Sequence, residues 1–248
     1  MHSWKAGYMG ELLLLWYRRK IAVFGIFSVV VPILLAASFH ALQPILGFMA
    51  VSQSFPLTML GIYTSVWIPL FIFMAAADLF PQEVASRTLK LALLRPNSRF
   101  QVYGAKTAAL ATGIAALLVL LGIVSLACNL FAGTLAGFAE TAAIVKAYIA
   151  SFVSMLALAA VFVFTAQFFK SSSGFMAFSI VLYAAAKIAP FLSSAVAAFS
   201  PASYTDWYKL WLSQTVSAGK LTTAFLFLAS CSLLFFSLGY YKFVRKEV

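Results

Sequence analysis

Charged residues are scarce in this chain of 248 residues. They make up 9% of the sequence, and only six of them are acidic, whereas a soluble domain averages about 25% charged residues. Hydrophobic residues make up 64%, and the mean hydropathy is +1.00. Such a chain has too few polar side chains to cover a water-facing surface. A soluble globular fold is therefore excluded, and the lipid bilayer is the expected solvent.

Residues that bind metals or carry out catalysis are also few. The two cysteines, Cys128 and Cys231, fall within or at the ends of apolar runs and lack the spacing of metal ligands, so they are expected to be small buried hydrophobic residues. The two histidines, His2 and His40, have no metal-binding partner nearby in the sequence. We therefore expect no catalytic residue, no metal site and no cofactor in this chain.

A phosphate-binding loop is missing as well. The segment Gly104-Ala105-Lys106-Thr107 is similar to the end of such a loop. The motif requires glycine directly before the lysine, however, and Phe100 stands where its first glycine should be. The chain is not expected to hydrolyse ATP by that route, and a pump driven by ATP would need a separate subunit.

Six apolar runs are each close to the roughly 20 residues that an α-helix needs to cross the hydrocarbon core. The alternation typical of a membrane β-barrel is absent. We predict an all-α polytopic membrane protein, with a single transmembrane domain over residues 1–248. The expected transmembrane helices cover residues 21–41, 57–77, 107–130, 147–169, 175–199 and 221–241.

The basic residues are distributed asymmetrically around these runs. Thirteen of the 17 lysines and arginines fall on the side of the two termini, three fall on the opposite side, and Lys187 lies within a span. Because positive charge is retained on the cytoplasmic side, both termini are predicted to be cytoplasmic. The same bias explains the net charge of +11, so no nucleic-acid partner is expected.

Residues 1–20 are expected to form an interfacial helix. Trp4, Tyr8, Leu12, Leu15 and Trp16 recur at helical spacing, and the charged residues lie elsewhere on the helix. This pattern is typical of a helix lying along the inner leaflet in contact with membrane lipids. The charged part is too long for a cleavable signal peptide. A simple basic flank of the first span is the alternative.

The longest polar and charged stretch between apolar runs is residues 78–106. Pro81 suits the first turn of a helix, and Pro96 suits a helix end. The apolar residues of this helix share one face, and the charged residues share another, formed by Glu83, Arg87 and Lys90. The sequence predicts a basic loop with a short amphipathic helix between the second and third spans.

Residues 83–106 also carry a longer pattern. It consists of Glu83-Val-Ala-Ser-Arg-Thr-Leu-Lys90, then Leu93-Leu-Arg-Pro96, Ser98-Arg99 and Lys106. This resembles the first cytoplasmic loop of ABC-2-type transporter permeases, which reads roughly E-x-x-S-G-T-L-K, then L-L-x-x-P, S-R and a later lysine. Arg87 departs from the pattern, because the family usually has glycine there. In that family the loop forms a coupling helix, which sits in a groove of a separate ATP-hydrolysing subunit.

The resemblance implies a role and partners for the chain. The chain would be a transporter subunit, not an enzyme, and would work by alternating access in a bacterial plasma membrane. Its partners would be a dimer of cytoplasmic ATPase subunits, which bind ATP and Mg, and a second permease chain, identical or homologous. The residues implied in coupling to the ATPase are Glu83, Ser86, Arg87, Thr88 and Lys90.

Lys187 is a candidate substrate-pathway residue. It lies twelve residues past Phe175, which is about 18 Å along a helix and near the bilayer centre. Ionisable residues at that depth usually face a bundle interior or a cavity. The alternative is that the long side chain reaches outward to the membrane surface.

The segment after the fifth span is aromatic, with Tyr204, Trp207 and Trp211 at nearly helical spacing. One interpretation is an aromatic belt at the level of the lipid headgroups. The other comes from the resembling family, in which short helices re-enter the outer leaflet between spans 5 and 6 and shape a substrate exit. These residues favour an amphiphilic substrate, such as a peptide antibiotic, a drug or a lipid-like molecule.

Two other classes of function are alternatives. A self-contained secondary transporter usually has several polar residues or broken helices at the membrane midplane, and here Lys187 alone meets that description. An intramembrane enzyme needs paired His, Glu or Asp residues, and the expected spans contain none.

Overall fold

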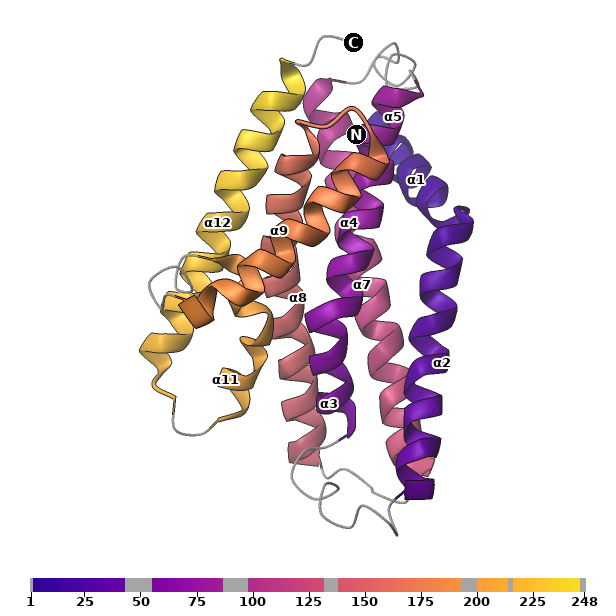
Figure 1. Cartoon of the computed structure of the whole chain (residues 1–248), viewed down its shortest axis with the longest axis vertical. Coiled ribbons are helices and arrows are strands. Elements are labelled where there is room, and N and C mark those ends of the chain that lie inside the picture. Colours follow the sequence, from indigo (N-terminus) through magenta and orange to yellow (C-terminus); the bar gives the residue numbers. More distant parts are fainter. Residues whose placement is uncertain are drawn as a thin grey trace.

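Six helices that are long and apolar enough to cross a membrane form the computed structural model of the chain (Figure 1). The structure describes residues 2–42, 55–86, 98–131, 138–192, 200–213 and 216–245, and these ranges contain helices and turns but no strand. The predicted all-α polytopic fold is confirmed. The candidate spans are Arg19–Ser38, Phe55–Ala85, Arg99–Asn129, Glu140–Ala166, Ser172–Pro190 and Ala218–Val244.

The first half of the chain forms two spans, with one helix before the first span and one short helix at the end of the second. The elements are α1 (His2–Trp16), α2 (Arg19–Leu42), α3 (Phe55–Ile62), the π-helical turn η1 (Tyr63–Trp67), α4 (Ile68–Leu79) and α5 (Pro81–Ala85). α3, η1 and α4 follow one another without a break and make up most of the second span, which α5 completes.

The second half contributes four long helices and two short ones. The long helices are α7 (Arg99–Phe131), α8 (Phe138–Ala166), α9 (Ser172–Leu192) and α12 (Ala218–Val244). Between α9 and α12 lie the 3-10 helix η2 (Pro201–Asp206) and α11 (Tyr208–Leu212). Two short helices are thus present in the aromatic segment.

The expected loop at residues 78–106 is shorter than predicted. Asp78 belongs to α4, and Lys106 belongs to α7, which begins at Arg99 and not at residue 107. The prediction ended the helices where charged residues began. In the structure both charges are buried inside helices and paired with charges from other parts of the bundle, so they do not end the helix.

α4 is the centre of the bundle. All of its residues except Leu70 are buried, as expected for a helix that is hydrophobic on all sides. It contacts α7, α8 and α9, while α12 packs on α8 and α2 packs on α7. The spans formed by α2, α9 and α12 are largely exposed, which places them at the periphery, where lipid contacts a membrane protein.

The arrangement defines two ends of the molecule. α1, α5 and the last turns of α12 lie at one end, which we call the terminal end, and α3 begins toward the other (Figure 1). α9 crosses the bundle obliquely. η2 and α11 contact α8, and η2 also contacts η1 in the interior of the second span.

A close approach between α7, α8 and α12 depends on one glycine. The ring of Tyr103 is fully buried, and its hydroxyl donates to the carbonyl of Phe236 at 3.3 Å. A Cβ atom added at Gly239 would lie 2.3 Å from Tyr103 Oη and 3.5 Å from Cα of Phe164. The separation from Phe164 is an ordinary contact, but the Tyr103 ring is fully buried and its hydroxyl would have to move, so a larger residue would push α12 off the bundle.

We expect Gly239→Ala to lower the thermal unfolding temperature of the purified protein. Overpacking of a close contact costs about 1–3 kcal/mol, which exceeds the gain of about 0.5–1 kcal/mol that alanine otherwise brings to a helix. Gly25→Ala is the matched control, because a Cβ at Gly25 meets nothing within 4 Å. Equal shifts for the two variants would contradict the packing argument.

A buried charge network as the candidate functional site

α5 is one short helix at the terminal end of the second span. Phe80, with φ −121° and ψ −70°, leaves the helical conformation after α4, and Pro81 begins α5. Proline suits this first position because the amide hydrogen that it lacks would have no helical acceptor there. Ser86 closes the helix, since its Oγ donates to the carbonyl of Gln82 at 2.9 Å.

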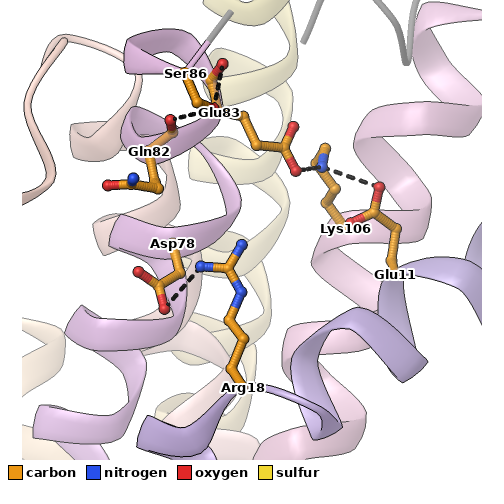
Figure 2. A network of polar contacts seen from close by, with 7 residues as sticks. All are labelled: Glu11, Arg18, Asp78, Gln82, Glu83, Ser86 and Lys106. Atoms are coloured by element: carbon orange, nitrogen blue, oxygen red, sulfur yellow. Dashed lines mark hydrogen bonds and ion pairs between the residues drawn. The ribbon is translucent and has the colours of Figure 1, made fainter. Parts of the chain in front are cut away.

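Lys106 of α7 ties α5 to α1. Its side chain is 0% exposed, and its Nζ lies 3.0 Å from Glu11 Oε1 and 2.5 Å from Glu83 Oε1. Figure 2 shows the ammonium group between the two carboxylates, which come from α1 and α5. One buried cation therefore binds three elements that are distant in the sequence.

Asp78, one turn before α5, forms a second set of ion pairs. Its carboxylate is buried, and Oδ2 lies 3.0 Å from Arg18 Nη1 (Figure 2). Oδ1 accepts from Lys20 Nζ at 3.4 Å. Because Arg18 and Lys20 flank the start of α2, these pairs fix the junction between α1 and α2 to the end of α4.

These six residues, which we call the charge network, are electrically neutral as a set. They are Glu11, Arg18, Lys20, Asp78, Glu83 and Lys106. Three of the six acidic residues in the whole chain are used here. A buried charge is tolerated only when it is paired and hydrogen-bonded. The pairing therefore explains why these charges are found within an otherwise apolar bundle.

Three buried carboxylate oxygens in the network have no hydrogen-bond partner among the described residues: Glu11 Oε2, Asp78 Oδ2 and Glu83 Oε2. Asp78 Oδ2 is ion-paired with Arg18, so Glu11 Oε2 and Glu83 Oε2 keep spare hydrogen-bonding capacity. The network can fix helices in place and can accept further donors. Within the described ranges, no three His, Cys, Asp or Glu side chains lie close enough together to hold a metal ion.

Two of the predicted coupling residues lie on or beside α5. Glu83 faces inward and is bound to Lys106, although the sequence placed it on the charged, outward face. Ser86 is exposed at the end of α5. Arg87, Thr88 and Lys90 lie outside the described residues, as does the rest of the predicted amphipathic helix.

Lys187, the predicted pathway residue, lies near the end of α9. Its Nζ donates to Thr205 Oγ1 in η2 and lies 5.8 Å from the ring centroid of Tyr183. Two further ionisable residues, Asp78 and Lys106, also lie within candidate spans and are more completely buried than Lys187.

The three predicted aromatic residues do not share one environment. Trp207 is buried and packs edge-on against Trp211, with ring centroids 5.5 Å apart. Tyr204 packs against Phe227 of α12, and Trp211 is exposed. η2 and α11 therefore pack on the bundle through Trp207 and Tyr204, while Trp211 points away from it.

Sequence reasoning missed Glu11, Asp78 and Lys106 as site residues. Each stands at the edge of an apolar run and was therefore assigned to a flank or a loop. A usable signal was the rarity of acidic residues, since a carboxylate beside a span in so apolar a chain needs a basic partner.

The fold and the network together define a multi-pass helical membrane protein with a polar junction at its terminal end. The family model described as ABC-2 family transporter protein matches residues 14–187, which include five of the six network residues, all except Glu11. The chain belongs to the ABC-2 transporter family and is a membrane permease component. The comparison with curated proteins finds no match.

We expect Lys106→Met to destabilise the fold strongly. Removing the shared cation leaves Glu11 and Glu83 buried without a counter-charge, and breaking a buried pair in this way costs about 3–5 kcal/mol. Lys20→Met is the control, because Lys20 is 60% exposed and an exposed pair contributes about 0–1 kcal/mol. Chemical unfolding in a single detergent measures both. Similar small losses for the two variants would contradict the role given to Lys106.

Proposed function

We propose that this chain is the membrane-spanning subunit of an ABC-2-type exporter, which moves an amphiphilic substrate across a bacterial plasma membrane. A separate cytoplasmic ATPase dimer binds ATP and Mg and supplies the energy. A second permease chain, identical or homologous, completes the pathway. The terminal end faces the cytoplasm, in agreement with the excess of basic residues on that side.

The observation that carries this proposal is the binding of Glu83 and Glu11 to Lys106. α5 leads directly into the stretch whose sequence matches the coupling loop of the family. A force applied to that stretch by an ATPase reaches α5 first. Through Glu83 and Lys106 it then reaches α7 and α1, and through the chain itself it reaches α4, the buried centre of the bundle.

α1 acts in this proposal as an interfacial brace. Leu15 is buried against the bundle, while Trp4, Met9, Leu14 and Trp16 expose large apolar surfaces. Such side chains on a helix at the membrane boundary insert among lipid headgroups and acyl chains. Glu11 binds α1 to Lys106 of α7, and Glu83 binds α5 to the same lysine. The brace and the coupling stretch are therefore attached to one residue.

Lys187 and the aromatic residues Tyr204, Trp207 and Trp211 belong to the half of the pathway that lies opposite the terminal end. The hydrogen bond from Lys187 to Thr205 positions η2 against α9. Trp207 and Tyr204 fasten the short helices to the bundle, and Trp211 faces outward, where an amphiphile would leave. We assign Lys187 a positioning role in this exit.

We expect Ala85→Trp to weaken binding of the ATPase subunit at least tenfold without affecting membrane insertion. Ala85 is exposed at the end of α5, so a bulky side chain there obstructs a partner that docks on this helix but leaves the charge network intact. The substitution changes no charge, so the positive-inside bias is kept. Co-purification of the ATPase with the detergent-solubilised permease measures the effect.

Val119→Trp is the matched control, because Val119 is exposed on the side of α7 and contacts lipid in this proposal. It should leave ATPase binding at the wild-type level. Unchanged ATPase binding by a correctly inserted Ala85→Trp variant would argue against docking at α5.

A further inference from the structure

A groove of about 420 Å³ lies between the second span and the two short helices that follow α9. One wall is a helical stripe on α3 and η1, and the other comes from η2 and α11. Most of its lining is apolar, with a few polar groups, which is the usual composition of a ligand site. The lining residues are Leu57, Thr58, Gly61, Ile62, Ser65, Val66, Asp206, Tyr208 and Lys209.

The groove runs alongside the second span and not beyond its end. η2 contacts η1, whose residues lie eight to twelve positions after Phe55, the first residue of the span. At 1.5 Å per residue this is about 12–18 Å along the helix. Figure 1 shows α11 beside α8, level with α3. Asp206 and Lys209 are therefore charges at membrane depth, where ionisable residues usually mark a substrate or ion site.

These two charges leave specific hydrogen-bonding groups available. Asp206 Oδ2 lies 3.3 Å from Lys209 Nζ. Asp206 Oδ1 is buried and accepts no hydrogen bond from the described residues. Lys209 remains 57% exposed, and its ammonium group has further protons to donate. The side chain of Asp206 is nevertheless 41% exposed, so the groove presents a carboxylate that can accept a further donor beside an ammonium group that can take an anion.

The apolar stripe suits the tail of an amphiphile. Ile62 is 44% exposed and Val66 is 54% exposed, and both are open to the groove. Gly61 adds no side chain to this wall of the groove, and a Cβ there would lie 2.9 Å from the hydroxyl of Tyr208. An acyl chain can therefore lie along α3 and η1 while its headgroup reaches Asp206 and Lys209.

We infer that this groove binds a phospholipid-like amphiphile whose headgroup joins a primary ammonium to a phosphate, the chemistry of phosphatidylethanolamine. The ammonium donates to the exposed side of the Asp206 carboxylate, the phosphate lies against Lys209 Nζ, and the acyl chains follow Ile62 and Val66 toward the bilayer. The binding is inferred from the groove alone, whereas export of the bound amphiphile rests on the proposed function.

The groove also touches the part of the second span that is least regular. Ser65 and Val66 belong to the π-helical turn η1, a feature found frequently at functional sites because it disturbs the helical hydrogen bonds. The carbonyl of Ser65 accepts from Tyr183 Oη of α9 at 2.7 Å. An occupant of the groove therefore contacts the turn that continues into α4 and α5, at the other end of which the charge network lies.

Binding to the purified chain in a neutral detergent, without any ATPase, tests this inference. The probes are short-chain phosphatidylethanolamine, phosphatidylcholine and phosphatidylglycerol, with affinity measured by calorimetry. We expect phosphatidylethanolamine to bind about tenfold more tightly than phosphatidylcholine, whose quaternary ammonium has no N–H donor, as one charge-assisted hydrogen bond allows. We expect phosphatidylglycerol, which lacks the cation, to bind more weakly than phosphatidylethanolamine as well.

Three variants separate the parts of the site. Asp206→Asn should remove the preference for phosphatidylethanolamine, whereas Glu140→Gln, which neutralises an exposed carboxylate at the start of α8, should keep it. Ile62→Trp, which fills the groove from an exposed position, should weaken all three lipids. Equal affinity of the wild type for the three lipids, or an unchanged preference in Asp206→Asn, would overturn the inference. Either result would leave docking of the ATPase at α5 untouched, because that is measured separately.

Discussion

A lysine without access to water must be paired, and the terminal end of this protein is arranged around that requirement. Lys106 is completely buried in α7, and the carboxylates that neutralise it come from α1 and α5. Unpaired, a charge in that place would be costly. The three elements therefore cannot separate without breaking an ion pair inside the protein. Asp78 adds the junction of α1 and α2 to the same end of α4.

This arrangement gives the second span a special position. α4 is buried along almost its whole length, so it is held by the bundle and not by lipid. One end of the span continues into α5 and the charge network, and the other end passes through the π-helical turn into α3 and the groove. A single chain segment thus joins the face proposed for the ATPase to the site proposed for the amphiphile.

The fold was largely readable from the sequence, and the site was readable only in part. Six long apolar runs require six helices, because lipid leaves few other ways to satisfy backbone hydrogen bonds. The family pattern contains both Glu83 and Lys106, but only Glu83 was assigned to the site, because a charge beside an apolar run looks the same whether it ends a helix or is buried within one. Partners 95 residues apart, such as Glu11 and Lys106, meet through packing between helices, which local periodicity does not encode.

The most direct test of the account is a double-mutant cycle on Glu83 and Lys106. The free energies of unfolding of the wild type, Glu83→Gln, Lys106→Met and the double variant are measured in one detergent. If the buried pair joins α5 to α7, the double variant loses less stability than the two single losses added together. The expected coupling is about 1–3 kcal/mol. Additive losses, within about 0.5 kcal/mol, would show that the two side chains act independently and would contradict the account.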